Sequence, residues 1–432
     1  MIRLVGCFSS LRYWCLLPLA HFGPKFRKIV YNFGLLQSVR FKKFRFPTAL
    51  ILIAVIFANC DNKNAKNKVG KKVRRPSISF AALPKSVRSP DDNPASVEKE
   101  LLGRFLFYDP ILSGNKDVAC ATCHHPNNGY AEFLDISIGV NGKGFGSRRD
   151  FRIPNDIPFV KRNAHSVLNT AFNGIDTKNH YNPKTAPMFW DDRAKSLESQ
   201  ALEPIKTLEE MRGRDYSETE ILKEVVKRVK NIPEYRKLFH NAFDDEEITI
   251  ENISKAIAAF ERTLLANNSR FDAYMRGDSE ALSISEKDGF ELFKKVGCAN
   301  CHNGPMFSDY KSHVLGVPEN KKLPLPDRGI GDSFAFRTAS LRNLRFTAPY
   351  MHNGSFNDLQ RVLEFYEDIS FGRSRNPLLP KEKFDPLVRE LELSVKDMSQ
   401  IISFLNSLND QDFDKSIPEK VPSGLPVAGN IQ

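Results

Sequence analysis

The sequence has few cysteines, and none is left over for a disulfide framework in the body of the chain. Of the seven cysteines among 432 residues, three lie in the first 60 residues and four lie in two short motifs. Alternating apolar and polar runs, which would predict β-strands, are also scarce. A small disulfide-stapled protein and an all-β domain are therefore excluded, and the length allows two domains of ordinary size.

Excess positive charge is absent outside the N-terminal segment. The formal net charge is +11, but residues 1–80 contain 16 Lys and Arg against one Asp, a balance of +15. Taking +15 from +11 leaves −4 for the remainder of the chain. The basic character belongs to the leader, which excludes nucleic acid as a partner.

Long hydrophobic runs are missing as well. The apolar stretch 46–58 is shorter than a membrane span requires, and it lies between a basic run and Cys60. We expect residues 1–60 to be a lipoprotein-type signal with Cys60 as its lipidation site, and residues 61–94 to be a disordered linker. Ordinary secretion and an uncleaved anchor are the alternatives. In each case we expect the mature protein in the periplasm. If Cys60 is lipidated, we expect the N-terminal lipid to attach the protein to a membrane.

The sequence does contain two copies of Cys-x-x-Cys-His. Two intervening residues place both sulfurs on one turn, and the next residue points its imidazole at a metal between them. This is the attachment signature of c-type haem, in which each thiol forms a thioether and the His ligates the iron. We predict two covalently bound haem c groups, held by Cys120, Cys123, His124, Cys298, Cys301 and His302.

A structural zinc site is the alternative interpretation of these motifs. Two Cys-x-x-Cys pairs together could supply four thiolates to one zinc ion. A four-cysteine site does not need the His that follows each pair, however, and each pair is preceded by its own apolar, helix-like stretch, at 101–108 and 290–296. These observations favour haem.

The body of the chain is predicted to be helical. Apolar residues recur at helical spacing over 253–264 and 398–408, and Ser394 with Asp397 forms a capping box before the second segment. Long stretches rich in Asn, Gly and Pro intervene. Such a pattern is typical of cytochrome c domains, in which the haem fills much of the core.

An internal duplication is also predicted. Each haem motif is followed by an Arg-Asn segment, at 162–169 and 337–343, and then by an aromatic turn that opens a helix, at 188–197 and 350–359. We therefore predict an all-α fold of two cytochrome c-like haem domains with long loops. The domains are expected to span 95–270 and 271–412, followed by a tail at 413–432.

These segments together resemble the bacterial di-haem cytochrome c peroxidase family, which includes MauG. The resemblance covers roughly residues 95–410 and rests on the motifs CATCH, RNAHSVLN, MFWDDRA, CANCH and FRTASLRNLRFTAPYMHNGS. It implies a peroxide-reacting N-terminal haem with His124 as its proximal ligand and an electron-transferring C-terminal haem with His302. Asp192 departs from the family pattern, which has Gly there, so that turn is expected to differ locally.

The resemblance also implies three catalytic residues. Glu210 would take a proton from the near oxygen of peroxide and return it to the far one, and Gln200 would orient the oxygens. Trp190 would relay an electron between the haems. On residue pattern alone, Glu210 and Gln200 could form a solvated helix face and Trp190 could be a core aromatic.

The sixth ligand of each haem defines the subclass. Val140 stands where many family members have a displaceable His, so the first haem is expected to lack that ligand; His125, His165 and His180 could in principle replace it. Tyr366 stands where the same members have Met, and MauG-like members have Tyr. The resemblance thus implies Tyr366 as a ligand of the second haem iron, although helix pattern alone equally allows a buried Tyr. Met351 ranks second for this role.

A calcium site between the haems is implied as well, formed by the Asn163 side chain with the carbonyl groups of Thr347 and Pro349.

The leading hypothesis is a periplasmic peroxidase that reduces hydrogen peroxide with electrons from a small cytochrome c or cupredoxin. A second is a MauG-like enzyme that oxidises aromatic side chains of a partner protein. A third, from another class, is a non-catalytic electron carrier or redox sensor.

Overall fold

The computed structural model describes residues 78–244 and 247–432. The predicted leader, Cys60 and the predicted linker up to residue 77 lie outside the described residues. No helix in the described ranges combines the length and the apolar character that crossing a membrane requires.

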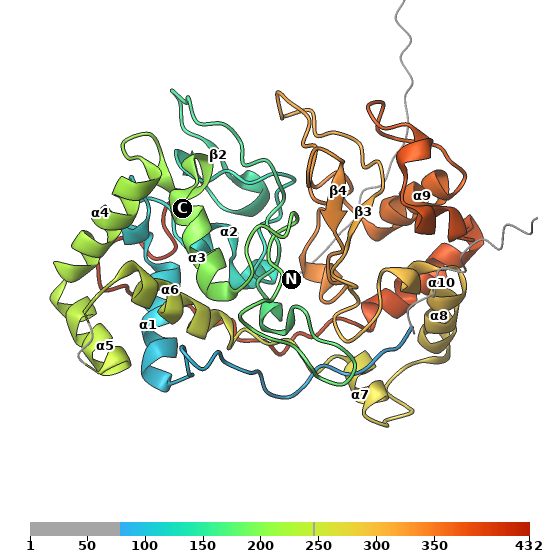
Figure 1. The fold of residues 1–432 in the computed structure, drawn as a ribbon, viewed down its shortest axis with the longest axis horizontal. Coiled ribbons are helices and arrows are strands. Elements are labelled where there is room, and N and C mark those ends of the chain that lie inside the picture. Colours follow the sequence, from blue (N-terminus) through green and yellow to red (C-terminus); the bar gives the residue numbers. More distant parts are fainter. Residues whose placement is uncertain (1–77, 245–246) are drawn as a thin grey trace, which may run out of the picture. The chain divides into compact units, whose positions relative to one another are not determined.

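The fold is mostly helical, as predicted, with long loops between the helices (Figure 1). The α-helices are α1 (Val97–Tyr108), α2 (Cys120–Cys123), α3 (Leu197–Lys206), α4 (Glu218–Lys230), α5 (Pro233–Phe243), α6 (Ile250–Glu261), α7 (Arg270–Met275), α8 (Ile284–Lys295), α9 (Leu359–Ser370) and α10 (Val395–Asn406). A π-helical turn, η5, spans Leu208–Arg212.

Short 3-10 helices and two small sheets complete the described part of the chain. The 3-10 helices are η1 (Pro110–Leu112), η2 (Pro126–Asn128), η3 (Gly146–Arg148), η4 (Thr170–Phe172), η6 (Cys298–Asn300), η7 (Leu344–Phe346), η8 (Lys381–Lys383) and η9 (Pro386–Glu390). The antiparallel pairs are β1 (Gly142–Lys143) with β2 (Asp150–Phe151), and β3 (Ser312–Val314) with β4 (Ala335–Arg337).

The first haem motif is supported by the packing of α1 on α6. Leu106 and Ile257 are fully buried in the core that these helices share. A Cβ on Gly103 would lie 1.9 Å from the carbonyl oxygen of Ala256, so only glycine allows the two helices to approach this closely. α1 begins where the Ser96 hydroxyl accepts a hydrogen bond from the Lys99 amide.

The second haem motif is supported in the same way by α8 and α10. Phe293 and Ile401 are buried between them, and a Cβ on Gly289 would lie 2.1 Å from the carbonyl oxygen of Gln400. The predicted capping box of α10 is confirmed: the Ser394 amide donates to the Asp397 carboxylate at 3.0 Å, and the Ser394 hydroxyl lies 2.6 Å from it.

Two segments predicted to lie outside the haem domains pack against them. Residues 78–94 are not a disordered linker: Leu83 is buried, and its amide donates to the Asp272 carboxylate at 2.9 Å. Residues 413–432, predicted as a tail after the second domain, return to the first half, where Phe413 and Val421 are buried in the core. The chain end returns to the helices of the first half (Figure 1). Isolated apolar side chains in polar segments gave no periodic signal for either contact.

Candidate active site and electron-transfer site

The first Cys-x-x-Cys-His motif lies on the wall of a cavity in the first half. Cys120, Cys123 and His124 all line it. His124 Nδ1 lies 3.1 Å from the carbonyl oxygen of Tyr130, so Nδ1 carries the proton and Nε2 is left to ligate a metal. Burial lowers the pKa of His124, which keeps the ring in the neutral, ligating form.

Glu210 and Gln200 line the same cavity, as the family resemblance implies. Gln200 extends from α3, and its buried Oε1 has no hydrogen-bond partner within the described residues. Glu210 lies in the π-helical turn η5, whose amides converge on the Thr207 carbonyl. Burial raises the pKa of Glu210 to about 7, partly opposed by Arg193 and reinforced by Glu209.

Val140 adjoins this turn and is buried. Its amide donates to the Glu209 carbonyl at 3.3 Å, and its side chain has no atom that could bind iron. Of the three histidines considered as substitutes, His125 stacks edge-on against Phe145 and His180 is exposed beside Asp176. Neither lines a cavity that holds a haem motif, whereas His165 does.

Trp190 lies between the two haem motifs and lines the cavities of both. Its indole Nε1 donates to the Asn163 carbonyl at 3.0 Å, and its own carbonyl accepts from the Arg337 amide at 2.7 Å. These bonds tie residues from both halves to one tryptophan. In the following turn Asp192 adopts a positive φ of 56°, so it keeps the left-handed geometry that glycine favours and that Asp tolerates.

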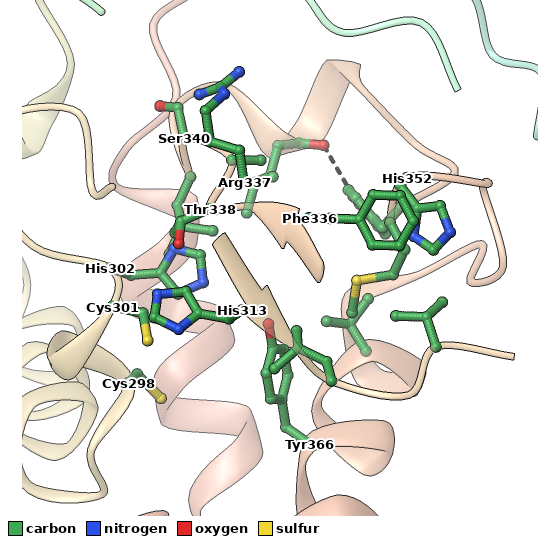
Figure 2. A pocket seen from close by; sticks show the side chains of 18 of the residues that line it. Cys298, Cys301, His302, His313, Phe336, Arg337, Thr338, Ser340, His352 and Tyr366 are labelled. Atoms are coloured by element: carbon green, nitrogen blue, oxygen red, sulfur yellow. Dashed lines mark hydrogen bonds between the residues drawn. The ribbon is translucent and has the colours of Figure 1, made fainter. Parts of the chain in front are cut away.

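The second motif lies on the wall of a separate cavity, shown in Figure 2. His302 Nδ1 lies 3.0 Å from the Phe307 carbonyl, which again leaves Nε2 for a metal. Tyr366 projects from α9 toward this cavity, on the side of Cys298 and His302. Its hydroxyl has no hydrogen-bond partner among the described residues, and burial raises its pKa above the usual range. Met351 lines the same cavity but packs against the apolar cluster beside α9.

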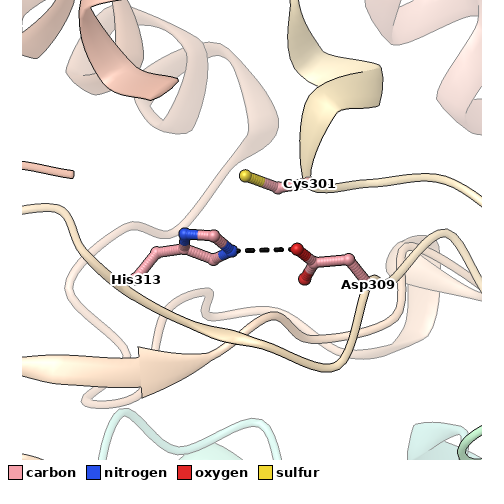
Figure 3. A group of neighbouring side chains, drawn as sticks. All are labelled: Cys301, Asp309 and His313. Carbon is pink, nitrogen blue, oxygen red and sulfur yellow. Dashed lines mark hydrogen bonds and ion pairs between the residues drawn. The ribbon is translucent and has the colours of Figure 1, made fainter. Parts of the chain in front are cut away.

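Sequence reasoning missed a charged cluster beside the second motif (Figure 3). Ligand atoms of Cys301, Asp309 and His313 lie within 4.8 Å of one another. Both ring nitrogens of His313 are already engaged, however, at 3.1 Å from Asp309 and 2.7 Å from Asp385. Burial opposes its charge, but hydrogen bonds with Asp309 and Asp385 raise the pKa of His313. The cluster is therefore a buried ion-pair clamp rather than a vacant metal site.

Part of this clamp could have been found from the sequence. Asp309 and His313 are four residues apart and closely follow the second motif, whereas Asp385 is 72 positions from His313.

Glu132 was missed by sequence reasoning as well. It is buried, its carboxylate oxygens have no partner within the described residues, and burial raises its pKa to about 7. Nothing in its local sequence marks it.

The three residues of the predicted calcium site all border the second cavity. Asn163, Thr347 and Pro349 all line it. The Asn163 amide nitrogen donates to the Leu134 carbonyl at 2.7 Å, which leaves its Oδ1 as the free acceptor. One side-chain oxygen and two carbonyl oxygens are the donor type that a hard cation prefers.

Comparison with known proteins identifies the family of this chain. A family model described as di-haem cytochrome c peroxidase matches residues 97–280. The methylamine utilization protein MauG of Methylorubrum extorquens is 34% identical over 342 residues, 78% of this chain and 85% of that protein. The cytochrome c551 peroxidase of Nitrosomonas europaea is 32% identical over 337 residues, 76% of this chain and 85% of that protein.

A solved structure of a MauG-like protein associated with microbial copper homeostasis superposes with a TM-score of 0.60 at 28% identity, covering 76% of this chain and 95% of that one. Membership of the family implies two haem c groups. The residues present fit them, since each cavity presents two thiols and a histidine whose Nε2 is available. The chain belongs to the di-haem cytochrome c peroxidase family and is an oxidoreductase that acts on peroxide.

Proposed function

We propose that this protein reduces hydrogen peroxide to water at the first cavity, with electrons that enter through the second from a small cytochrome c or cupredoxin. The observation that carries the proposal is the asymmetry of the two cavities. Glu210 and Gln200 face the first, and the Tyr366 side chain faces the second. Haem bound at the two motifs supplies the redox centres. We further propose that the enzyme works in the periplasm.

Glu210 is suited to move the proton that peroxide cleavage requires. A carboxyl group with a pKa of about 7 is partly ionised near neutral pH, so it can accept a proton from one peroxide oxygen and donate it to the other. The Gln200 side chain supplies a neutral amide that can hydrogen-bond the peroxide oxygens.

The second cavity is suited to hold an electron-transfer centre. His302 and Tyr366 both face it, so an iron held there would have two protein ligands and no open position. A phenolate donor favours the oxidised metal and lowers its potential. Trp190, which lines both cavities, is the residue through which an electron would pass from one to the other.

A second candidate function is favoured by two specific residues. Val140 removes the displaceable ligand from the first site, and Tyr366 supplies a phenol to the second, as in MauG-like members of the family. A MauG-like enzyme would use peroxide to oxidise aromatic side chains of a partner protein. The third hypothesis is a pure electron carrier. Such a protein needs neither a carboxyl group in the first cavity nor a first haem that lacks a second protein ligand.

The test is steady-state turnover of the holoprotein with peroxide and a reduced cytochrome c or cupredoxin. The proposal expects donor oxidation that saturates with peroxide, and loss of that activity in Glu210→Gln. Glu218→Gln, which changes an exposed carboxylate on α4, is the control. Rapid reaction with peroxide but no donor oxidation would favour the MauG-like function, and no reaction with peroxide would favour the carrier.

Duplication of one haem domain is a further part of the proposal. It is supported by matched local features: Asn169 and Asn343 both adopt a positive φ before a 3-10 helix, η4 and η7. The Asn169 amide donates to the Leu264 carbonyl after α6, and the Asn343 amide donates to the Leu408 carbonyl after α10. A structural superposition of 95–265 on 271–408 that fails to align these pairs would contradict it.

We also propose calcium at Asn163, Thr347 and Pro349, and lipidation at Cys60. Calcium would join the first half to the second, so chelation should slow electron transfer between the haems and leave both attached. Mass spectrometry of the mature protein would locate its first residue and detect a diacylglyceryl group. A mature chain that lacks Cys60, or that carries it unmodified, would contradict lipidation.

A further inference from the structure

The imidazole of His165 is stacked on the indole of Trp190. The ring centroids are 4.0 Å apart and the planes are inclined by only 26°. Near-parallel stacking at this distance brings the π-systems into contact. On another side, His352 meets the same indole edge-on at 6.3 Å. Trp190 is thus held between two histidines, and His165 is the one that covers its ring face.

Like Trp190, His165 lies between the two haem sites. It lines both cavities, and its Nε2 is buried without a hydrogen-bond partner in the described part of the chain. Arg337 lies close to this ring.

We propose that His165 is the positioning residue of the electron relay: its stacked ring holds the indole of Trp190 in line between the two cavities and shares the positive charge when Trp190 is oxidised. This inference rests on the proposed relay role of Trp190. In that role the indole loses one electron toward the first site and regains one from the second. No proton needs to leave, because the Nε1 proton is donated to the Asn163 carbonyl, which is not a base.

The surroundings of Trp190 explain why such a partner is needed. The Arg337 guanidinium donates to the carbonyl of Phe189, the neighbour of Trp190, and Arg162 and Arg193 also approach His165. Their positive charges oppose an indole cation. An aromatic ring in contact with the indole face places π-density where the positive charge develops, as in cation–π contacts.

The experiment compares two variants of similar side-chain size in the holoprotein. His165→Phe keeps an aromatic face but has no nitrogen, and His165→Gln keeps a polar group but has no ring. Inter-haem electron transfer after peroxide mixing is followed by stopped-flow spectroscopy, together with both haem potentials and the kcat/KM for peroxide. His180→Gln, at an exposed site, is the control.

We expect His165→Gln to slow inter-haem electron transfer and to lower kcat by about tenfold. This is the rate factor that corresponds to the strongest aromatic pairs. His165→Phe should stay within about twofold of the parent. Both variants should leave kcat/KM for peroxide and the haem potentials unchanged. Equal rates in both variants, whether fast or slow, would overturn the stacking role. Trp190→Phe separates the two ideas: if it does not slow transfer, the relay itself is wrong.

Discussion

The pH dependence of the reaction with peroxide is the sharpest test of the active site, because it depends on one carboxyl group. Burial raises the pKa of Glu210 from 4.5 to about 7. Ionising it in this cavity therefore costs about 3 kcal/mol more than in water. The charged form is about a tenth of the population at pH 6 and about nine tenths at pH 8. Because the ionised form is the base, the rate constant should rise about tenfold across this range and fall as pH drops through 7.

The assay is stopped-flow mixing of the oxidised holoprotein with peroxide at pH values from 5.5 to 8.5. Glu210→Gln preserves the shape of the side chain but cannot ionise, so it should lower the rate constant by roughly 10²–10⁴-fold and remove the pH-dependent limb. Glu218→Gln should leave both unchanged. A flat profile in the parent protein, or a glutamine variant that retains the limb, would refute the assignment of Glu210 as the proton-transfer group.

Three further outcomes are expected. Tyr366→Phe should preserve packing on α9 but raise the reduction potential of the second haem by about tenths of a volt, which is within the range that a change of iron ligand produces. An unchanged spectrum and potential would exclude Tyr366 as a ligand. Gly103→Ala should cost about 1–3 kcal/mol in denaturant unfolding, because the added Cβ meets the Ala256 carbonyl, whereas Leu101→Ala, at an exposed position, should cost little. Deleting residues 413–432 should lower stability by on the order of 5 kcal/mol, since it removes buried side chains from the first core, and an unchanged unfolding midpoint would contradict that packing.

Much of the site was predictable because its signals are local. The haem-attachment motifs place two thiols and a histidine within one turn, and the carbonyl that orients each histidine follows within six residues. The capping box of α10 is equally local. Glu210 and Gln200 were identified through the family resemblance, since their own sequence is compatible with an ordinary solvated helix face.

Other features depend on where distant segments meet. The return of residues 413–432 to the first half, and the packing of residues 78–94, could not be inferred from isolated apolar side chains. Asp385 reaches His313 across 72 positions, and Trp190 joins Arg337 of the opposite half. Each of these contacts depends on the path of long loops that carry no periodic pattern.

The sequence by itself was enough to predict two attached haems and the residues that would attach them, because covalent attachment needs only side chains that are neighbours along the chain. The family resemblance implied that the two sites differ, but only the tertiary structure placed the residues: Glu210 and Gln200 line one cavity, Tyr366 lines the other, and Trp190 with His165 borders both. The physical reason is that proton transfer, axial ligation and electron transfer depend on distances between side chains from separate elements. Folding brings these elements together, and their local patterns do not encode those distances.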